Sequence, residues 1–240
     1  MSKAPEIKSA TDTALQDIKA NYEFIKEQID EAKDKADRKD TVRIMAVTKT
    51  VAVDRINYAE SLGITLLGEN RVQEFLEKHE NYSENSEIHF IGGLQNNKVK
   101  YIIDKVSMIH SVDSLKLAEE ISRRALSKNI TMDILLEVNI GNELSKGGFS
   151  DTELYEAAKA IKELRGVNVR GLMTIPPPLE SEYYFPRMQE LYEKLIGDGT
   201  LSGMDTLSMG MSGDYALAVK YGSNIVRIGS GLFGYRNYIK

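Results

Sequence analysis

Hydrophobic and polar positions follow two different patterns along the chain. In the first 40 residues, charged side chains surround apolar positions at helical spacing, which are Ala14, Ile18, Tyr22, Ile25 and Ile29. This spacing predicts an amphipathic helix whose apolar stripe packs against the outside of the fold. The polar segment DKADRKD, residues 34–40, ends this pattern. We therefore expect an N-terminal helical extension over residues 1–40.

Beyond residue 41, short apolar and β-branched runs alternate with amphipathic helical segments. We expect strands at residues 42–48, 64–68, 88–92, 106–112, 133–140, 169–175, 206–209 and 224–228. Segments 114–128 and 151–166 have the spacing of surface helices. Strands that are almost entirely apolar and are joined by helices are typical of a parallel sheet covered by helices. Eight such units predict an α/β fold, a single (β/α)8 TIM barrel.

An open, doubly wound sheet is the competing architecture. The count of eight strands favours the barrel, and no GxGxxG follows the first predicted strand. The chain has neither a linker rich in Pro, Gly and Ser nor a repeated sequence block. Residues 1–240 are therefore interpreted as one domain.

Composition excludes several classes of function. The chain has no cysteine, which rules out disulfides, thiolate zinc sites and cysteine nucleophiles. The three histidines, His79, His89 and His110, lack the spacing of metal ligands, so we interpret them as surface or core residues and expect no metal. A net charge of −5, spread along the chain, argues against nucleic-acid binding. With no signal-like start and no apolar run of transmembrane length, we expect a cytoplasmic protein without membrane contact.

A lysine stands at the place where a TIM barrel carries its chemistry. Functional groups of such barrels lie at the carboxyl ends of the strands. Lys49 directly follows the first predicted strand, where a partly desolvated amine would be a nucleophile towards carbonyl groups. The alternative is a lysine that extends its charged end into solvent.

The last two predicted strands end in glycines and serines, in SMGMSGD (208–214) and RIGSG (227–231). Glycines let backbone N–H groups approach an anion, and Ser212 and Ser230 add hydroxyl donors. These two loops commonly form the phosphate site of TIM barrels, although ordinary turns would explain either loop separately. A lysine and a phosphate site at one barrel mouth are what pyridoxal 5'-phosphate (PLP) requires.

Arg227 lies two residues before Gly229, so its side chain should point to the same side of the strand. A guanidinium is always charged, and beside the pyridine nitrogen of PLP it would disfavour the pyridinium form that makes the cofactor a strong electron sink. Such a site would hold PLP while stabilising carbanions poorly. The alternative is an ion pair between Arg227 and an acidic neighbour.

Eight sequence blocks occur in a fixed order between about residue 41 and residue 236. They are AVTKT, GENRVQEF, HFIGGLQNNKVK, IHSVDSLKLAEEIS, LLEVNIGNELSKGGF, VRGLMTIPP, LSMGMSGDYALAVKYGS and VRIGSGLFGYR. In these blocks the sequence resembles the YggS/PROSC family of pyridoxal phosphate homeostasis proteins, which is similar to the N-terminal barrel of alanine racemases. The resemblance implies a Schiff base between PLP and Lys49. It also implies phosphate contacts at Ser212, Gly229 and Ser230, Arg227 near the pyridine nitrogen, and Asn70 and Met173 in the pocket lining.

The resemblance further implies a protein that binds, buffers or delivers PLP, with PLP-dependent apoenzymes as candidate recipients. We expect a monomer that is not an enzyme, because a racemase-type second domain that supplies a catalytic tyrosine is not apparent. A single-domain amino-acid racemase, with Tyr221, Tyr235 or Tyr238 as acid/base, is the second hypothesis. An aldolase or isomerase that acts on sugar phosphates without PLP is the third.

Overall fold

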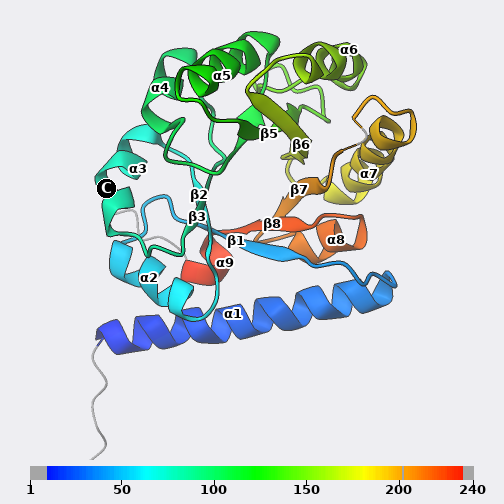
Figure 1. The fold of residues 1–240 in the computed structure, drawn as a ribbon. Coiled ribbons are helices and arrows are strands. Elements are labelled where there is room, and N and C mark those ends of the chain that lie inside the picture. Colours follow the sequence, from blue (N-terminus) through cyan, green and yellow to red (C-terminus); the bar gives the residue numbers. More distant parts are fainter. Residues whose placement is uncertain (1–9, 202, 235–240) are drawn as a thin grey trace, which may run out of the picture.

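A computed structural model describes residues 10–201 and 203–234 and shows a closed barrel of parallel strands that pair in chain order (Figure 1). The strands are β1 Arg43–Val47, β2 Leu66–Glu69, β3 Glu87–Phe90, β4 Met108–Val112, β5 Met132–Val138, β6 Val167–Thr174, β7 Thr206–Met211 and β8 Ile225–Ile228. β8 pairs with β1 and closes the ring. The predicted TIM barrel is confirmed, and each observed strand overlaps one of the predicted runs.

Helices follow the strands and surround the barrel. They are α2 Val53–Ser61, α3 Val72–Lys78, α4 Val99–Ile102, α5 Leu115–Ser127, α6 Asp151–Lys162, α7 Ser181–Gly197, α8 Tyr215–Lys220 and α9 Ser230–Phe233. Two 3-10 turns, His79–Asn81 and Asn96–Lys98, precede β3 and α4. Ser150 and Glu153 form a reciprocal capping box at the start of α6, which satisfies backbone N–H groups of its first turn.

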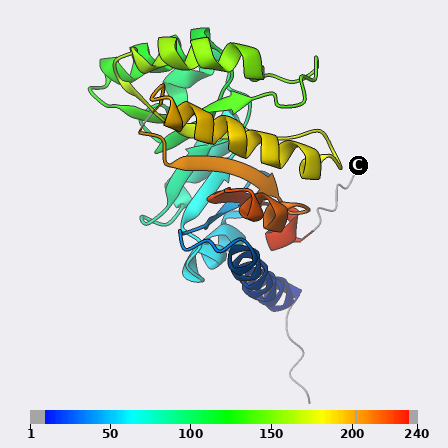
Figure 2. The same cartoon turned by 90° about the vertical axis from the view of Figure 1, so that its right-hand side faces the viewer.

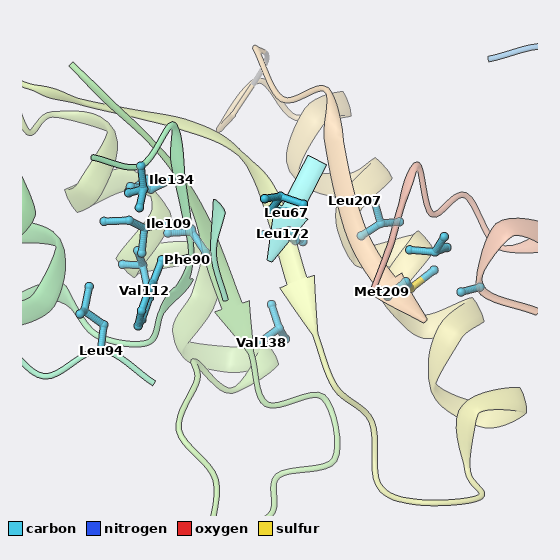
Figure 3. Packing of buried hydrophobic residues seen from close by; sticks show 14 of the residues in the cluster. Leu67, Phe90, Leu94, Ile109, Val112, Ile134, Val138, Leu172, Leu207 and Met209 are labelled. Atoms are coloured by element: carbon cyan, nitrogen blue, oxygen red, sulfur yellow. The ribbon is translucent and has the colours of Figure 1, made fainter. Parts of the chain in front are cut away.

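The largest hydrophobic core lies between the strands and the outer helices, because alternate side chains of each strand point outward. Figure 3 shows this layer, with Leu67, Phe90, Ile109, Ile134, Leu172 and Leu207 from successive strands. Smaller clusters fill the barrel interior, one formed by Met45, Val47, Leu66, Ile91 and Ile225, and the other by Met108, Leu135 and Met173. The apolar layers hold the strand ends in a fixed arrangement, on which the site depends.

The N-terminal helix α1, Ala10–Lys35, crosses the outside of the barrel along α2, α9 and α8 (Figures 1 and 2). Ile18, Ile25 and Ile29 are buried in this contact, as the helical pattern predicts. The Asn21 side chain donates a hydrogen bond from Nδ2 to Leu232 O at 3.0 Å and ties α1 to α9. Among the described residues, no helix combines the length and the apolar character that a membrane span requires.

Candidate functional site

A cavity of about 490 Å³ opens at the carboxyl ends of the strands. Its lining residues are Val47, Lys49, Asn70, Ile91, Ile175, Met211, Ser212, Arg227, Gly229 and Ser230. Six of the seven residues proposed from the sequence therefore lie around one cavity. Met173 does not line it, contrary to expectation. The Met173 side chain is 1% exposed and packs with Met108 and Leu135 in the barrel interior.

The backbone on both sides of Lys49 is held by helix α3. The Thr50 backbone N–H donates to the Glu74 carboxylate, and Lys78 Nζ donates to Thr48 O at 3.3 Å. Lys78 and Glu74 also form an ion pair at 2.5 Å, so the two contacts support each other. Thr50 has a φ of 60°, an uncommon conformation for a β-branched residue that needs such support. The half-buried Lys49 thus extends from a fixed turn into the cavity.

A buried carboxyl group joins the strand ends that carry Lys49 and Asn70. Glu69 Oε1 accepts hydrogen bonds from Thr48 Oγ1 at 2.6 Å and from Tyr82 OH at 2.5 Å. Glu69 is fully buried, and burial raises the pKa of its carboxyl. Because neighbouring side chains of a strand alternate, Glu69 points away from the cavity that Asn70 lines. Its role is to fix the ends of β1 and β2 relative to each other.

Asn70 supplies a polar atom without a protein partner. Its Oδ1 is buried and forms no hydrogen bond, although it belongs to a cavity-lining side chain. A buried polar atom left unpaired is unfavourable, so this oxygen is a candidate acceptor for a bound ligand. The turn after β3 passes close to the backbone of Asn70, because a Cβ at position 92 would lie 2.1 Å from the Asn70 backbone carbonyl oxygen. Gly92 is therefore required for this close approach.

The loops after β7 and β8 meet in the wall of the cavity. Ser212 Oγ accepts a hydrogen bond from the Gly231 N–H at 3.0 Å and joins the two loops. Asp214 holds the first loop, since its Oδ1 accepts from Met211 N at 2.6 Å and its Oδ2 from Ser181 Oγ at 2.6 Å. Ser212, Gly229 and Ser230 consequently share one wall.

Arg227 lies in the cavity wall and is only 3% exposed. Its Nη1 donates to Ser208 Oγ at 2.8 Å, and its Nη2 donates to Thr174 O at 2.9 Å. Among the described residues no carboxylate oxygen lies within 4.0 Å of its nitrogens, so the alternative of an ion pair is wrong. Burial lowers the pKa of Arg227 to about 10, which leaves the guanidinium charged at neutral pH.

The polar ends of β4 and β5 do not line the cavity, although they also lie at carboxyl ends of strands. Ser111 Oγ donates to Gly92 O at 2.6 Å, and Asn139 Oδ1 accepts from Glu143 N at 3.0 Å. These groups close turns. Near them, burial and the neighbouring Asp113 raise the pKa of Glu137 to about 7. Sequence analysis missed Glu137, because its unusual environment depends on contacts between strands.

The lining of the cavity has a one-sided charge. Among the described residues, it contains the two cations Lys49 and Arg227, the hydroxyl groups of Ser212 and Ser230, and no acidic residue. Its volume lies within the range of about 300–1,000 Å³ that is usual for small-molecule sites. These donors suit an anionic ligand, and the Lys49 amine suits one that carries a carbonyl group, while the unpaired Asn70 oxygen could accept a hydrogen bond from the ligand. PLP has both features, and the residues present are compatible with it.

Comparison with known proteins agrees with this chemistry. The family of the alanine racemase N-terminal domain matches residues 15–237. A pyridoxal phosphate homeostasis protein of Aquifex aeolicus is 44% identical over 218 residues, which cover 88% of this chain and 95% of that protein. The protein of the same name from Escherichia coli K12 is 35% identical and is covered over its whole length, with 94% of this chain. The chain belongs to the family of pyridoxal phosphate homeostasis proteins.

Solved structures include several similar barrels. A protein of Bifidobacterium adolescentis superposes with a TM-score of 0.87 at 33% identity, over 95% of this chain and 98% of that one. PipY of Synechococcus elongatus, solved with PLP bound, superposes with a TM-score of 0.75 at 30% identity, over 86% and 100% of the two chains. An alanine racemase of Clostridium difficile, at 17% identity, a TM-score of 0.72 and coverage of 94% and 58%, shares the fold.

Proposed function

We propose that this homeostasis protein binds PLP in the cavity at the carboxyl ends of the strands, with the cofactor linked as a Schiff base to Lys49. The observation that carries the proposal is the charge of the lining, in which the described part of the chain places two cations and no carboxylate. A relative with PLP bound and relatives named for PLP homeostasis support the choice of ligand.

The chain's own groups have separate tasks in this proposal. Lys49 supplies the amine, and its flanking backbone is held by α3. Ser212 and Ser230, with the loop at Gly229, supply donors for the phosphate. Arg227 and Asn70 both line the cavity, and in this proposal Arg227 would lie near the pyridine nitrogen. When bound, PLP supplies an aldehyde for the imine and an electron sink for amino-acid chemistry.

The proposed role is to hold and exchange PLP, without catalytic turnover. Arg227 stays charged, so it would disfavour a protonated pyridine beside it and weaken the electron sink. Tyr221, one candidate acid/base of a racemase, packs against the hydrophobic core and does not line the cavity. Tyr235 and Tyr238 lie outside the described residues. A racemase would exchange the α-proton of alanine or serine in deuterated water faster than free PLP does, and we expect no such exchange.

Delivery to PLP-dependent apoenzymes by a cytoplasmic monomer completes the proposal. Size-exclusion chromatography with light scattering should give the mass of one chain, 26.9 kDa.

The test is the absorbance spectrum of the purified protein after incubation with PLP and removal of the excess. The wild type should show the band of a protein-bound imine, and Lys49→Ala should lack it. Lys105→Ala is the matched control, because Lys105 is an exposed lysine far from the cavity lining. An imine band that persists in Lys49→Ala would overturn the assignment of the lysine.

A further inference from the structure

A line of buried polar side chains crosses the barrel interior behind the cavity. Arg227 Nη1 contacts Ser208 Oγ at 2.8 Å, and Ser208 Oγ contacts His110 Nδ1 at 3.2 Å. His110 Nε2 lies 2.9 Å from His89 Nδ1, and His89 Nε2 lies 2.9 Å from Glu87 Oε1. His110 is 0% exposed and His89 is 1% exposed. The line starts at the cavity wall and ends in a second cavity at the amino ends of the strands, which Glu87 and His89 line.

The two ends of this line fix the direction of every hydrogen bond in it. A guanidinium can only donate, so Ser208 Oγ accepts from Arg227 and its own proton is available to His110 Nδ1. Because a hydroxyl oxygen can also accept two hydrogen bonds, the Glu87 end decides the rest: the carboxylate accepts, so with both rings neutral His89 Nδ1 is an acceptor and His110 donates to it from Nε2. His89 in turn carries its proton on Nε2 and donates to the Glu87 carboxylate, which also forms an ion pair with Arg43 at 2.5 Å. In the opposite direction a neutral His89 would present a lone pair to the carboxylate.

Both imidazoles are neutral in this arrangement. The charged groups that act on them are Arg43, Glu87 and Asp133 around His89, and Arg43 and Arg227 around His110. Burial lowers the pKa of both rings, and for His110 the nearby positive charges lower the pKa further. A proton added to His110 would place a second positive charge between Arg227 and His89. The line from Arg227 through Ser208, His110 and His89 to Glu87 is called the histidine relay below. It therefore has one stable arrangement of protons.

We infer that His89 and His110 are positioning residues, which hold the Arg227 guanidinium in the cavity wall through Ser208. A buried polar line is unfavourable unless each member is paired, and apolar residues fill the neighbouring interior positions at Met108, Leu135 and Met173. The second anchor of Arg227 is a neutral carbonyl, Thr174 O. Both anchors are neutral, so neither supplies Arg227 with an ion-pair partner, while the carboxylate that ends the relay lies at the other mouth. The inference rests on the proposed function only where PLP serves as a probe.

The proton arrangement can be tested without PLP. Side-chain nitrogen NMR of protein with labelled histidine should show two neutral rings protonated on Nε2 at pH 7, assigned to His89 and His110 with a His79→Gln variant. The chain has three histidines, so two signals remain in that variant. A proton on Nδ1 of His89 or His110, or a doubly protonated ring, would overturn the relay whether or not PLP binds.

The positioning role is tested on the PLP-loaded protein with variants that break single links. His110→Leu and Ser208→Ala should each weaken PLP binding about tenfold and broaden the Arg227 guanidinium NMR signal. His110→Asn should restore both to within threefold, because an asparagine carbonyl can replace the Nδ1 acceptor towards Ser208. Ser111→Ala is the control, since Ser111 is a buried hydroxyl on the same strand that bonds to Gly92 O outside the relay.

Two outcomes decide the positioning role. If His110→Leu binds PLP as tightly as Ser111→Ala and leaves the Arg227 signal sharp, the inference is wrong, although PLP binding itself stands. If His110→Leu weakens binding and His110→Asn does not recover it, His110 acts through packing and the inference is equally wrong. An absence of PLP binding in the wild type would defeat the proposed function, while the histidine NMR would still report on the relay.

Discussion

The two mouths of this barrel differ in whether their charged side chains are paired. At the amino ends of the strands, a cavity of about 270 Å³ is lined by two arginines and three acidic residues. Arg43 pairs with Glu87, and Arg170 pairs with Asp133 at 2.6 Å and with Asp205. At the carboxyl ends, Lys49 and Arg227 form no ion pair among the described residues. The charges at the amino-end mouth are paired with one another, whereas the carboxyl-end mouth presents positive charge to a ligand.

This difference separates stability from binding within one fold. Paired charges at the amino ends join strands across the barrel floor, since Arg43–Glu87 links β1 to β3 and Arg170–Asp133 links β6 to β5. TIM barrels commonly place stabilising contacts at this end. At the carboxyl ends, Arg227 is held by hydrogen bonds to neutral groups, and an anion would supply the missing counter-charge. Substitutions at one mouth should therefore change ligand affinity, and substitutions at the other should change unfolding free energy.

The largest expected effect is at the phosphate wall. The double variant Ser212→Ala/Ser230→Ala should bind PLP about 100-fold more weakly, because a hydrogen bond to a charged group contributes about 1.5–3 kcal/mol. Pyridoxal, which lacks the phosphate, should bind to the variant and to the wild type equally. Equilibrium titrations with both compounds check this.

Ser114→Ala provides the control for these serine changes. Ser114 caps α5 by accepting a hydrogen bond from Leu117 N at 3.3 Å, and it lies outside the cavity lining. Its loss should lower the unfolding free energy by about 1 kcal/mol without changing PLP affinity. Equal weakening of PLP and pyridoxal in the double variant would contradict the phosphate assignment.

The raised pKa of Glu137 predicts that the unfolding free energy depends on pH. Its pKa is raised from 4.5 to about 7 in the folded state, so folding favours the protonated carboxyl. Unfolding free energy should then fall as pH rises from 4.5 to 7. In Glu137→Gln, this fall in unfolding free energy should be absent. Above pH 7 the variant should therefore be more stable than the wild type, by on the order of 2 kcal/mol.

Urea unfolding at pH 4.5 and pH 8 measures the difference between Glu137→Gln and the wild type. The two proteins should have similar stability at pH 4.5 and should differ at pH 8. A stability difference that is the same at both pH values would show that Glu137 is not the titrating group.

At the amino-end mouth, Arg170→Leu should lower the unfolding free energy by about 1–2 kcal/mol. The change removes a cation shared by two carboxylates, in a partly exposed network where solvent weakens each contact. Added salt should reduce this stability difference, and PLP affinity should not change. A loss of PLP affinity in Arg170→Leu would mean that the two mouths are not separable as described.

The smallest expected effect comes from the clamp on the lysine turn. Glu74→Gln keeps an acceptor for Thr50 N but loses the ion pair with Lys78, so PLP affinity should fall about threefold, equivalent to about 0.6 kcal/mol. Glu77→Gln, on the same helix and bonded to Gln73 at 3.1 Å, should leave PLP affinity unchanged. If the two variants bind PLP with the same affinity, the contacts from α3 to the lysine turn do not contribute to PLP binding.

Much of the fold could be predicted because each strand appears as an apolar run and each helix as an amphipathic segment. Lys49, Ser212 and Gly229 could be placed in one site because carboxyl ends of barrel strands meet at one mouth. Met173 could not be placed correctly, since the register of β6 against β5 and β7 decides which inward residue reaches the cavity. Strand ends alone did not distinguish a lining residue from one that closes a turn.

The histidine relay also could not be predicted from the sequence. His89 and His110 lie on neighbouring strands, 21 residues apart, and Ser208 is a further 98 residues along the chain. Their contact depends on the closure of the barrel and on which face of each strand points inward. The sequence interpretation of these histidines as surface or core residues did not include a bond between them.

Borohydride reduction of the PLP-loaded wild-type protein, followed by peptide mapping, tests the central claim most directly. Reduction makes the imine linkage permanent and marks the lysine that holds the cofactor. We expect a single pyridoxyl label, on the peptide that contains Lys49. A label on any other lysine, or a loaded protein that takes up no label, would contradict the account.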